Sequence, residues 1–290
     1  MPRALAQLLW LKIDCAAKLA RWFLQAAGLS GVMNITQYFS LIDTMARMSL
    51  KADASRYFFG YIWWVLEPLL YVLVFYVVFE LILQNRKEDF LVFLMVGKLT
   101  FIWFSKSVNQ AARSIINSGG LISKANISKS LFPMATVQEG LYKQLSVFLL
   151  LFVVLLANGY GITIIWFWLI PLILVNYIVI VACCLVCAFL VSLVFDFIVV
   201  VSLGTIFLLF VSGIFWDPRD LPDPAATDLI LLLNPLAFVI DAYRQILMVG
   251  MAPDAWHLLG IGVGFGLLAL GMVLILRRTS QFLALKVLTS

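Results

Sequence analysis

The sequence predicts an all-α, polytopic membrane protein with six transmembrane helices, an N-terminal amphipathic helix at the membrane interface, and short re-entrant helices before the last span. Of its 290 residues, 64% are apolar and 12% are charged, whereas soluble proteins average about half apolar and a quarter charged. Several apolar segments also reach the roughly 20 residues that a helix needs to cross a bilayer. This composition excludes disordered, disulfide-rich and secreted proteins. The net charge of +5 is spread along the chain, which argues against nucleic acid as a partner and favours membrane lipids.

Residues 1–56 precede any span, so we predict a cytoplasmic or interfacial region over 1–56 and a transmembrane domain over 57–290. A signal peptide is not expected, because Lys12 and Asp14 interrupt the early apolar run. Further on, apolar side chains recur at helical spacing at Ile35, Tyr38, Phe39, Ile42, Met45 and Met48. This pattern predicts an amphipathic helix lying on the inner leaflet, with packing against a soluble partner as the alternative.

Six apolar segments are predicted to span, at residues 62–83, 90–108, 135–157, 162–195, 198–216 and 257–276. The fourth is over-long and contains Pro171, so we expect it to be tilted, kinked or partly interfacial. Residues 217–256 differ in character, because they contain several prolines and apolar runs too short to cross a bilayer. They are predicted to form short re-entrant or interfacial helices on one face of the membrane.

The distribution of Lys and Arg predicts the orientation. With the amino terminus inside, thirteen of these residues fall in inner segments and four in outer segments, at Arg86, Lys87, Arg219 and Arg244. This asymmetry places both termini in the cytoplasm, which agrees with six spans.

Charged residues within the spans are interpreted as local pairs. Glu139 and Lys143 are four residues apart and are expected to pair on one helix face, while Glu67 and Lys106 lie at similar depth and could pair between helices. Lys98 lies toward the outer side. None of these groups is deep enough to favour a proton relay.

The sequence contains no recognisable catalytic motif. Residues 97–100, GKLT, resemble the end of a phosphate-binding loop, but position 92 is Val and the segment lies within a span. Cys183, Cys184 and Cys187 fall in one apolar run and are interpreted as packing residues, since His257 is the only histidine. We therefore expect no catalytic residue, metal or cofactor in this chain, and an energy source in a partner.

Three motifs, in order, resemble those of ABC-2 type exporter permeases. They are residues 56–68 (RYFFGYIWWVLEP), residues 120–133 (GLISK to SLFP), and residues 213–244 (GIFW, then LP, LNPL, and Asp241, Tyr243 and Arg244). The branch that moves polysaccharides and polyol phosphates fits best, and the resemblance runs from about residue 40 to the end. The segment before the interfacial helix contains more residues than the resemblance to this family implies.

The resemblance implies a homodimer that binds two copies of a separate ATPase subunit, which would hold ATP and Mg. It also implies a coupling element in the cytoplasmic loop of residues 109–133. In this element Leu121 and Ile122 would supply an apolar contact, and Lys124 and Lys129 would supply basic charge. A second, shorter contact with the ATPase would lie around Asp196. An ordinary basic inner loop is the alternative interpretation.

A polymer exporter needs a path along which sugars can slide, and aromatic side chains offer flat apolar surfaces for this. The candidate residues are Trp63, Trp64, Tyr71, Phe75, Phe79, Phe207, Phe210, Phe215 and Trp216. Some of them lie at span ends, where aromatic belts form without such a function.

The outer hairpin, residues 217–256, is the candidate gate, with site residues Asp217, Pro222, Asn234, Pro235, Asp241 and Arg244. Asp241 and Arg244 are three residues apart and would pair on one face of a helix. Asp217 and Asp223 each precede a proline, which is typical of a residue that starts a turn.

The predicted function is outward export of a lipid-linked polysaccharide across a bacterial inner membrane, with O-antigen ahead of capsule and teichoic acid. The alternatives are an ABC-2 permease for drugs, haem or small lipids, a membrane-embedded glycosyl or acyl transferase, and a non-catalytic scaffold. The sequence does not specify the glycan or its lipid carrier.

Overall fold

The computed structural model describes residues 35–78, 89–124 and 127–289. The chain divides into two compact units, Met1–Thr44 and Met45–Ser290. The described part of the first unit is the start of helix α2 (Ile35–Arg56), in the range predicted to be an amphipathic helix. Within the second unit, the buried positions of α2 are Ala46, Leu50 and Ala54, whereas Met48, predicted to lie on the apolar face, is 68% exposed.

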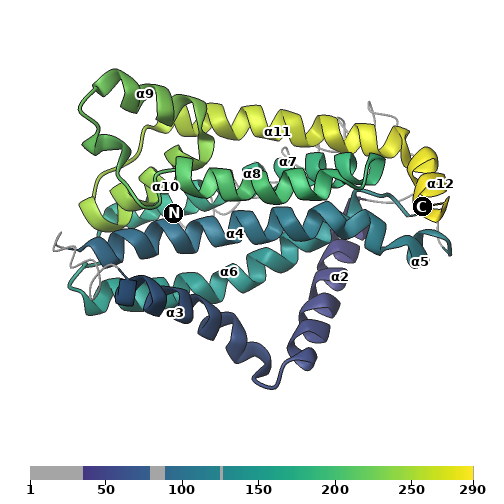
Figure 1. Cartoon of the computed structure of the whole chain (residues 1–290), viewed down its shortest axis with the longest axis horizontal. Helices are drawn as coiled ribbons and strands as arrows, with labels where there is room; N and C mark the ends of the chain where they lie inside the picture. Colours follow the sequence, from purple (N-terminus) through teal and green to yellow (C-terminus); the bar gives the residue numbers. More distant parts are fainter. Residues whose placement is uncertain (1–34, 79–88, 125–126, 290) are drawn as a thin grey trace, which may run out of the picture. The chain divides into compact units, whose positions relative to one another are not determined.

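The second unit is a helical membrane domain (Figure 1). Its long helices are α3 (Trp63–Phe75), which follows the short helix η1 (Gly60–Ile62), then α4 (Phe90–Asn117), α6 (Leu131–Ala157), α7 (Leu169–Leu193) and α11 (Ala255–Arg278). Among the described residues, five helical segments are long and apolar enough to cross a membrane, or six if one sharply bent pair forms a single span. This confirms a polytopic membrane protein.

Several predicted spans differ in extent from the observed helices. The span predicted over 90–108 corresponds to α4, which continues to Asn117 and so takes in the first part of the predicted coupling loop 109–133. The segment 198–216 corresponds to α8 (Phe197–Val211), whose 15 residues extend about 22 Å, less than the bilayer core of about 30 Å. The over-long segment 162–195 divides into η3 (Ile164–Trp168) and α7. Pro171 lies in the first turn of α7, where the missing N–H breaks no helical hydrogen bond, so it does not interrupt the helix.

Short helices precede the last span, as predicted. They are η4 (Pro218–Asp220), α9 (Pro224–Leu233), α10 (Pro235–Arg244) and the π-helical turn η5 (Gln245–Val249). The chain bends by 110° between α9 and α10. At the other end of the domain lie α5 (Gly119–Ile122) and α12 (Ser280–Thr289), so we name the two ends the α9 end and the α5 end (Figure 1).

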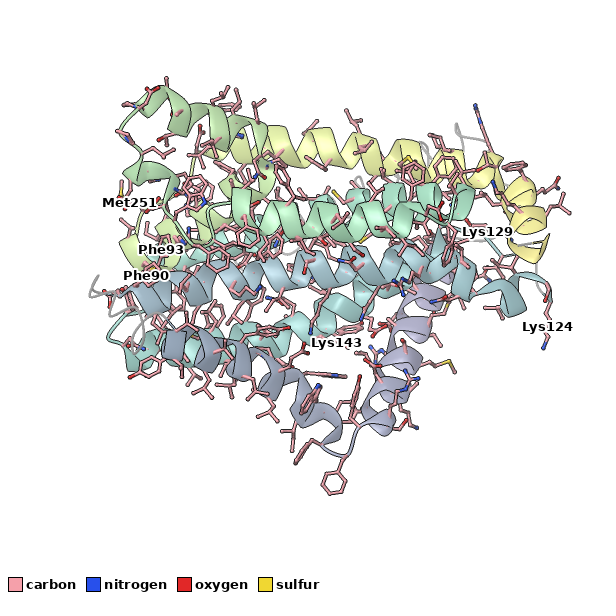
Figure 2. All side chains as sticks on the ribbon, in the orientation of Figure 1. Phe90, Phe93, Lys124, Lys129, Lys143 and Met251 are labelled. Atoms are coloured by element: carbon pink, nitrogen blue, oxygen red, sulfur yellow. The ribbon has the colours of Figure 1, made fainter. Side chains whose placement is uncertain are left out.

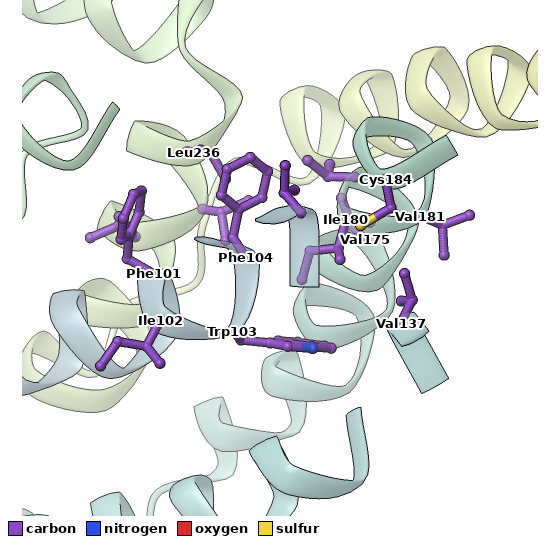
Figure 3. Close-up of a cluster of buried hydrophobic side chains, with 14 of the residues drawn as sticks. Phe101, Ile102, Trp103, Phe104, Val137, Val175, Ile180, Val181, Cys184 and Leu236 are labelled. Atoms are coloured by element: carbon purple, nitrogen blue, oxygen red, sulfur yellow. The ribbon is translucent and has the colours of Figure 1, made fainter. Parts of the chain in front are cut away.

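Helix α4 is the centre of the packing, with α6 and α7 as its most extensive neighbours, and α7 packs in turn against α11. Side chains from α4, α6, α7 and α10 form one buried cluster around Trp103 and Phe104 (Figure 3). Because lipid tails are as apolar as these side chains, close van der Waals packing rather than removal from water holds such helices together.

Small residues permit the close approach that this packing needs. A Cβ atom on Gly140 of α6 would lie 2.5 Å from the Ser107 hydroxyl of α4, and one on Gly262 of α11 would lie 3.1 Å from Val175 of α7. Gly97 of α4 has a different neighbour, since its Cβ would lie 2.6 Å from the Arg244 guanidinium. Glycine at position 97 therefore makes the space that a buried cation occupies.

We expect Gly97→Ala to destabilise the domain by about 1–3 kcal/mol, the usual cost of overpacking, because the added methyl group displaces Arg244. Thermal unfolding of the purified chain in detergent measures this. Gly271→Ala is the matched control, since Gly271 lies in α11 with no atom within 4 Å of an added Cβ. Equal melting temperatures for the two variants would contradict the prediction.

Candidate functional site

The aromatic residues at the start of α3 form a cluster. The Trp63 ring stacks with Tyr57 and Phe59, at centroid distances of 6.1 and 6.4 Å. Trp64 meets Tyr61 edge to face at 5.0 Å. Both tryptophans are half-buried, whereas Phe58 is 98% exposed. Tyr57, Phe58, Phe59 and Tyr61 are not among the predicted site residues, although their position in the first family motif is a signal.

Of the remaining path candidates, some lie on α3 and α8, two helices that each pack against α4, and two others follow α8 in the turn after it. Tyr71 of α3 is exposed, and the Lys98 ammonium of α4 lies 5.5 Å from its ring centroid. Phe207 and Phe210 of α8 are exposed, and Phe210 packs on the half-buried Phe215 at 5.7 Å. The Trp216 indole donates a hydrogen bond to the Phe210 carbonyl, at 2.9 Å. Phe75 belongs to α3, and Phe79 lies outside the described residues.

The predicted coupling residues fall into exposed and buried groups. Leu121 on α5 is 43% exposed, and Lys124 and Asp196 are also exposed, whereas Ile122 is buried. Lys129 is 2% exposed, and its ammonium donates to the Ile127 carbonyl at 3.1 Å. Burial lowers the pKa of Lys129. In Figure 2, Lys124 points away from the helices and Lys129 lies among them. Ile122 and Lys129 therefore do not present the docking surface expected of them.

Helix α12 is a neighbour that the sequence analysis missed, because it packs against both α5 and α7. Its residues Ser280–Thr289 follow the last span after a single residue, Thr279. The coupling segment therefore rests on the carboxyl-terminal helix as well as on α4.

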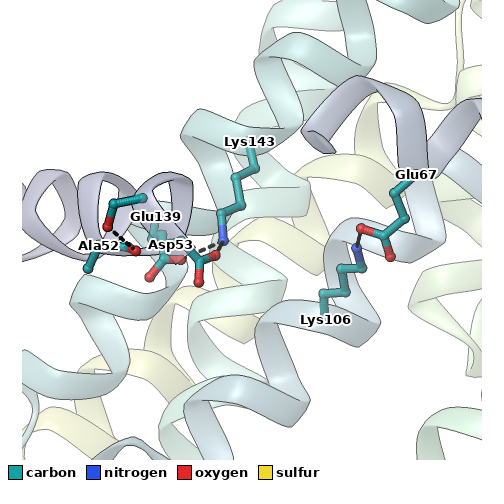
Figure 4. A network of polar contacts seen from close by, with 7 residues as sticks. Ala52, Asp53, Glu67, Lys106, Glu139 and Lys143 are labelled. Atoms are coloured by element: carbon teal, nitrogen blue, oxygen red, sulfur yellow. Dashed lines mark hydrogen bonds and ion pairs between the residues drawn. The ribbon is translucent and has the colours of Figure 1, made fainter. Parts of the chain in front are cut away.

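Both predicted ion pairs of the spans are confirmed (Figure 4). Lys106 of α4 lies 2.5 Å from Glu67 of α3. Lys143 lies 2.6 Å from Glu139 and also 2.5 Å from Asp53 of α2, an acidic partner that the sequence analysis missed. The Lys143 ammonium lies 5.7 Å from the Trp64 ring centroid. Lys143 thus links α2, α3 and α6.

Asparagine and aspartate side chains begin the short helices of the outer hairpin. Asp217 and Asp223 accept hydrogen bonds from the backbone N–H groups of Arg219 and Ala225, which confirms that they start turns. Asn234 caps α10 by accepting from two backbone N–H groups, and its amide donates to the Ser212 hydroxyl at 3.1 Å. Pro235 occupies the first position of α10, and Pro222 is exposed between η4 and α9.

The predicted pair between Asp241 and Arg244 is wrong. The buried Asp241 carboxylate instead accepts two hydrogen bonds from Arg219, at 2.9 and 2.8 Å, and one from Gln245 at 2.6 Å. The hydrogen bond to Asp241 raises the pKa of Arg219, so the guanidinium stays charged at physiological pH. The partner 22 residues away binds Asp241 because the Arg244 guanidinium points into the domain and donates to backbone carbonyls there.

Arg244 points into the domain. Its guanidinium donates to the carbonyls of Gly213 and Ile214, at 2.6 and 3.0 Å, and more weakly to the Phe93 carbonyl at 3.3 Å. Its Cζ lies 3.4 Å from the centroid of the Phe93 ring. The turn after α8 is therefore joined to the start of α4, and Gly213 allows this turn by adopting a φ of 70°.

We expect Asp241→Asn to loosen the outer hairpin, because an amide cannot accept both guanidinium hydrogen bonds and Arg219 loses its counter-charge. Hydrogen–deuterium exchange measures this as faster exchange over residues 212–223. The control is Asp228→Asn, which changes an exposed carboxylate of the same hairpin. Unchanged exchange over residues 212–223 in Asp241→Asn would contradict the expectation.

A family model and the similar proteins of known name both indicate an ABC-2 type permease. Residues 40–248 match the family model described as ABC-2 type transporter. Two O-antigen export system permease proteins RfbA of Klebsiella pneumoniae are similar to the chain. The first is 27% identical, and the match covers 75% of this chain and 83% of the relative. The second is 25% identical, and the match covers 75% of this chain and 84% of the relative. The RfbA permease of Myxococcus xanthus is 26% identical over 79% of this chain and 88% of the relative. The chain therefore belongs to the ABC-2 type transporter family.

Proposed function

We propose that the chain is the permease subunit of an ABC exporter that moves a lipid-linked polysaccharide, O-antigen in the first instance, outward across a bacterial inner membrane. The observation that carries this proposal is the similarity, over three quarters of the chain or more, to permeases named for O-antigen export. The chain provides the route, and a separate ATPase subunit binds ATP and Mg and supplies the energy.

The described geometry supports a route for a polymer. Tyr71, Phe207 and Phe210 are exposed on membrane helices that flank α4. Aromatic faces of this kind bind sugar rings through area rather than through fixed hydrogen bonds, so they permit sliding. We place the route between two copies of the chain, where these exposed faces of α3 and α8 would line it.

The membrane face on which the lipid-linked glycan accumulates tests this proposal. When the protein is depleted in its host, lipid-linked glycan should still be made and should accumulate on the cytoplasmic face of the inner membrane. Its sugar composition then distinguishes O-antigen from capsular polysaccharide. Arrested synthesis would instead favour a transferase, and unchanged glycan on both faces would favour efflux of small molecules.

The proposed ATPase contact is the exposed part of the α5 end. In this proposal the α5 end and both termini are cytoplasmic, and Leu121 fits an apolar recess of the ATPase while Lys124 faces acidic side chains. Asp196, at the start of α8, supplies a second contact. Ile122 supports α5 from within the domain, since it is 6% exposed.

We expect Leu121→Asp to leave the chain folded in the membrane but to reduce copurification with the ATPase and to abolish glycan export, because the contact then buries a carboxylate. Ile162→Asp is the control, since Ile162 is 71% exposed in the loop at the opposite end of α6. Wild-type copurification and export in Leu121→Asp would exclude α5 as the coupling element.

A further inference from the structure

Helix α12 exposes two large apolar side chains beyond the apolar part of the last span. Phe282 is 56% exposed and Leu285 is 67% exposed. The preceding helix α11 has 24 residues and extends about 36 Å, which exceeds the bilayer core of about 30 Å. It ends at Arg277 and Arg278, basic residues of the kind that lie at the level of the headgroups. Helix α12 therefore lies outside the hydrocarbon core.

The way in which α12 packs decides where these side chains point. Leu283 is fully buried, and α12 packs against α5 and α7. Leu285 comes two residues later, which turns it by about 200° around the helix, so it lies on the side opposite Leu283. Phe282 is three residues before Leu285 and neighbours it. Because α12 turns out of line with α11 and lies beside α5 at the end of the domain (Figure 1), its exposed side faces away from the membrane helices.

Helices α5 and α12 together form an apolar surface with basic charge. We define the α5–α12 surface by the exposed residues Leu121, Lys124, Arg278, Phe282 and Leu285. The sequence contains no acidic residue over 113–133 or over 277–289. In the proposed orientation this end of the domain faces the cytoplasm, and large apolar side chains that lie together on such a surface mark a contact with another protein.

Helix α5 alone is too small for the proposed ATPase contact. It has four residues, and of its two large apolar side chains Leu121 is exposed and Ile122 is buried. A stable interface buries about 800 Å² on each partner, contributed by roughly 20 to 30 residues. The ATPase must therefore contact further surface, and α12 supplies apolar surface directly beside α5.

We propose that the ATPase subunit docks on the whole α5–α12 surface, with Phe282 and Leu285 of the carboxyl-terminal helix as apolar anchors beside Leu121. The inference rests on the proposed function and names a second part of its ATPase contact. The matching face of the ATPase has an apolar recess, and acidic side chains around this recess face Lys124 and Arg278.

This contact connects the ATPase to a second membrane helix. Helix α5 follows α4 after Ser118, and α12 follows α11 after Thr279. Movement of the docked ATPase therefore displaces the inner end of the last span together with the inner end of α4.

Site-specific photocrosslinking tests the contact. The crosslinking residue p-benzoylphenylalanine takes the place of Phe282 or Leu285 in the full chain, which is coexpressed with the ATPase in inner-membrane vesicles. Both positions should form a crosslink that contains the ATPase. Leu267 is the matched control, because it is 65% exposed within the α11 span, and it should form none. Crosslinks only to a second copy of the chain, or only to lipid, at both α12 positions would overturn the proposal.

Alanine substitution measures the strength of the contact. Phe282→Ala combined with Leu285→Ala should lower the amount of copurified ATPase at least about fivefold, the usual effect of truncating interface anchors, while alanine preserves the helix. The control is Leu267→Ala combined with Leu270→Ala, which truncates two exposed side chains at the same spacing on α11. It should copurify as wild type does, and equal copurification of the two double variants would exclude α12 from the contact.

The same crosslinker at Leu121 separates this inference from the proposed function. A crosslink to the ATPase at Leu121 but at neither α12 position would keep α5 as the coupling element and overturn the role of α12. Absence of a crosslink at all three positions would overturn the α5 contact as well. Glycan export is measured independently, by the membrane face on which the glycan accumulates.

Discussion

The buried guanidinium of Arg244 joins helix α10 and the turn after α8 to the start of α4. A buried cation is costly unless its donors are paired, and Arg244 finds its acceptors at the carbonyls of Gly213, Ile214 and Phe93. These carbonyls lie in the turn after α8 and in the first turn of α4. Helix α10 is thereby held against α4 even though it is too short to span. Gly97 is part of the same arrangement, because a larger residue would occupy the space of the guanidinium.

A second ionic cluster organises the domain at α2, α3 and α6. Lys143 binds Asp53 and Glu139 and lies over the Trp64 ring. Because Glu139 is 7% exposed, removing the lysine would leave a buried carboxylate without its counter-charge. The aromatic cluster at the start of α3 and the later part of α2 are thus fixed to one residue of α6. In the proposed exporter, movement of α2 would be transmitted to the first residues of the route through this contact.

The two kinds of exposed surface on the membrane helices have different chemistry. Helices α3 and α8 expose aromatic rings, and the adjoining face of α4 exposes amides and a guanidinium.

The sequence by itself determined the helical membrane class, most of the spans, the starts of η4 and α9 in the hairpin and the pair between Glu139 and Lys143. All of these depend on local periodicity, on capping residues or on a spacing of four residues. Only the tertiary structure decided that Arg219 rather than Arg244 binds Asp241, that Asp53 joins Lys143, and that Lys129 is buried. These outcomes depend on which helices meet, and competition among distant partners is settled by packing rather than by their separation along the chain.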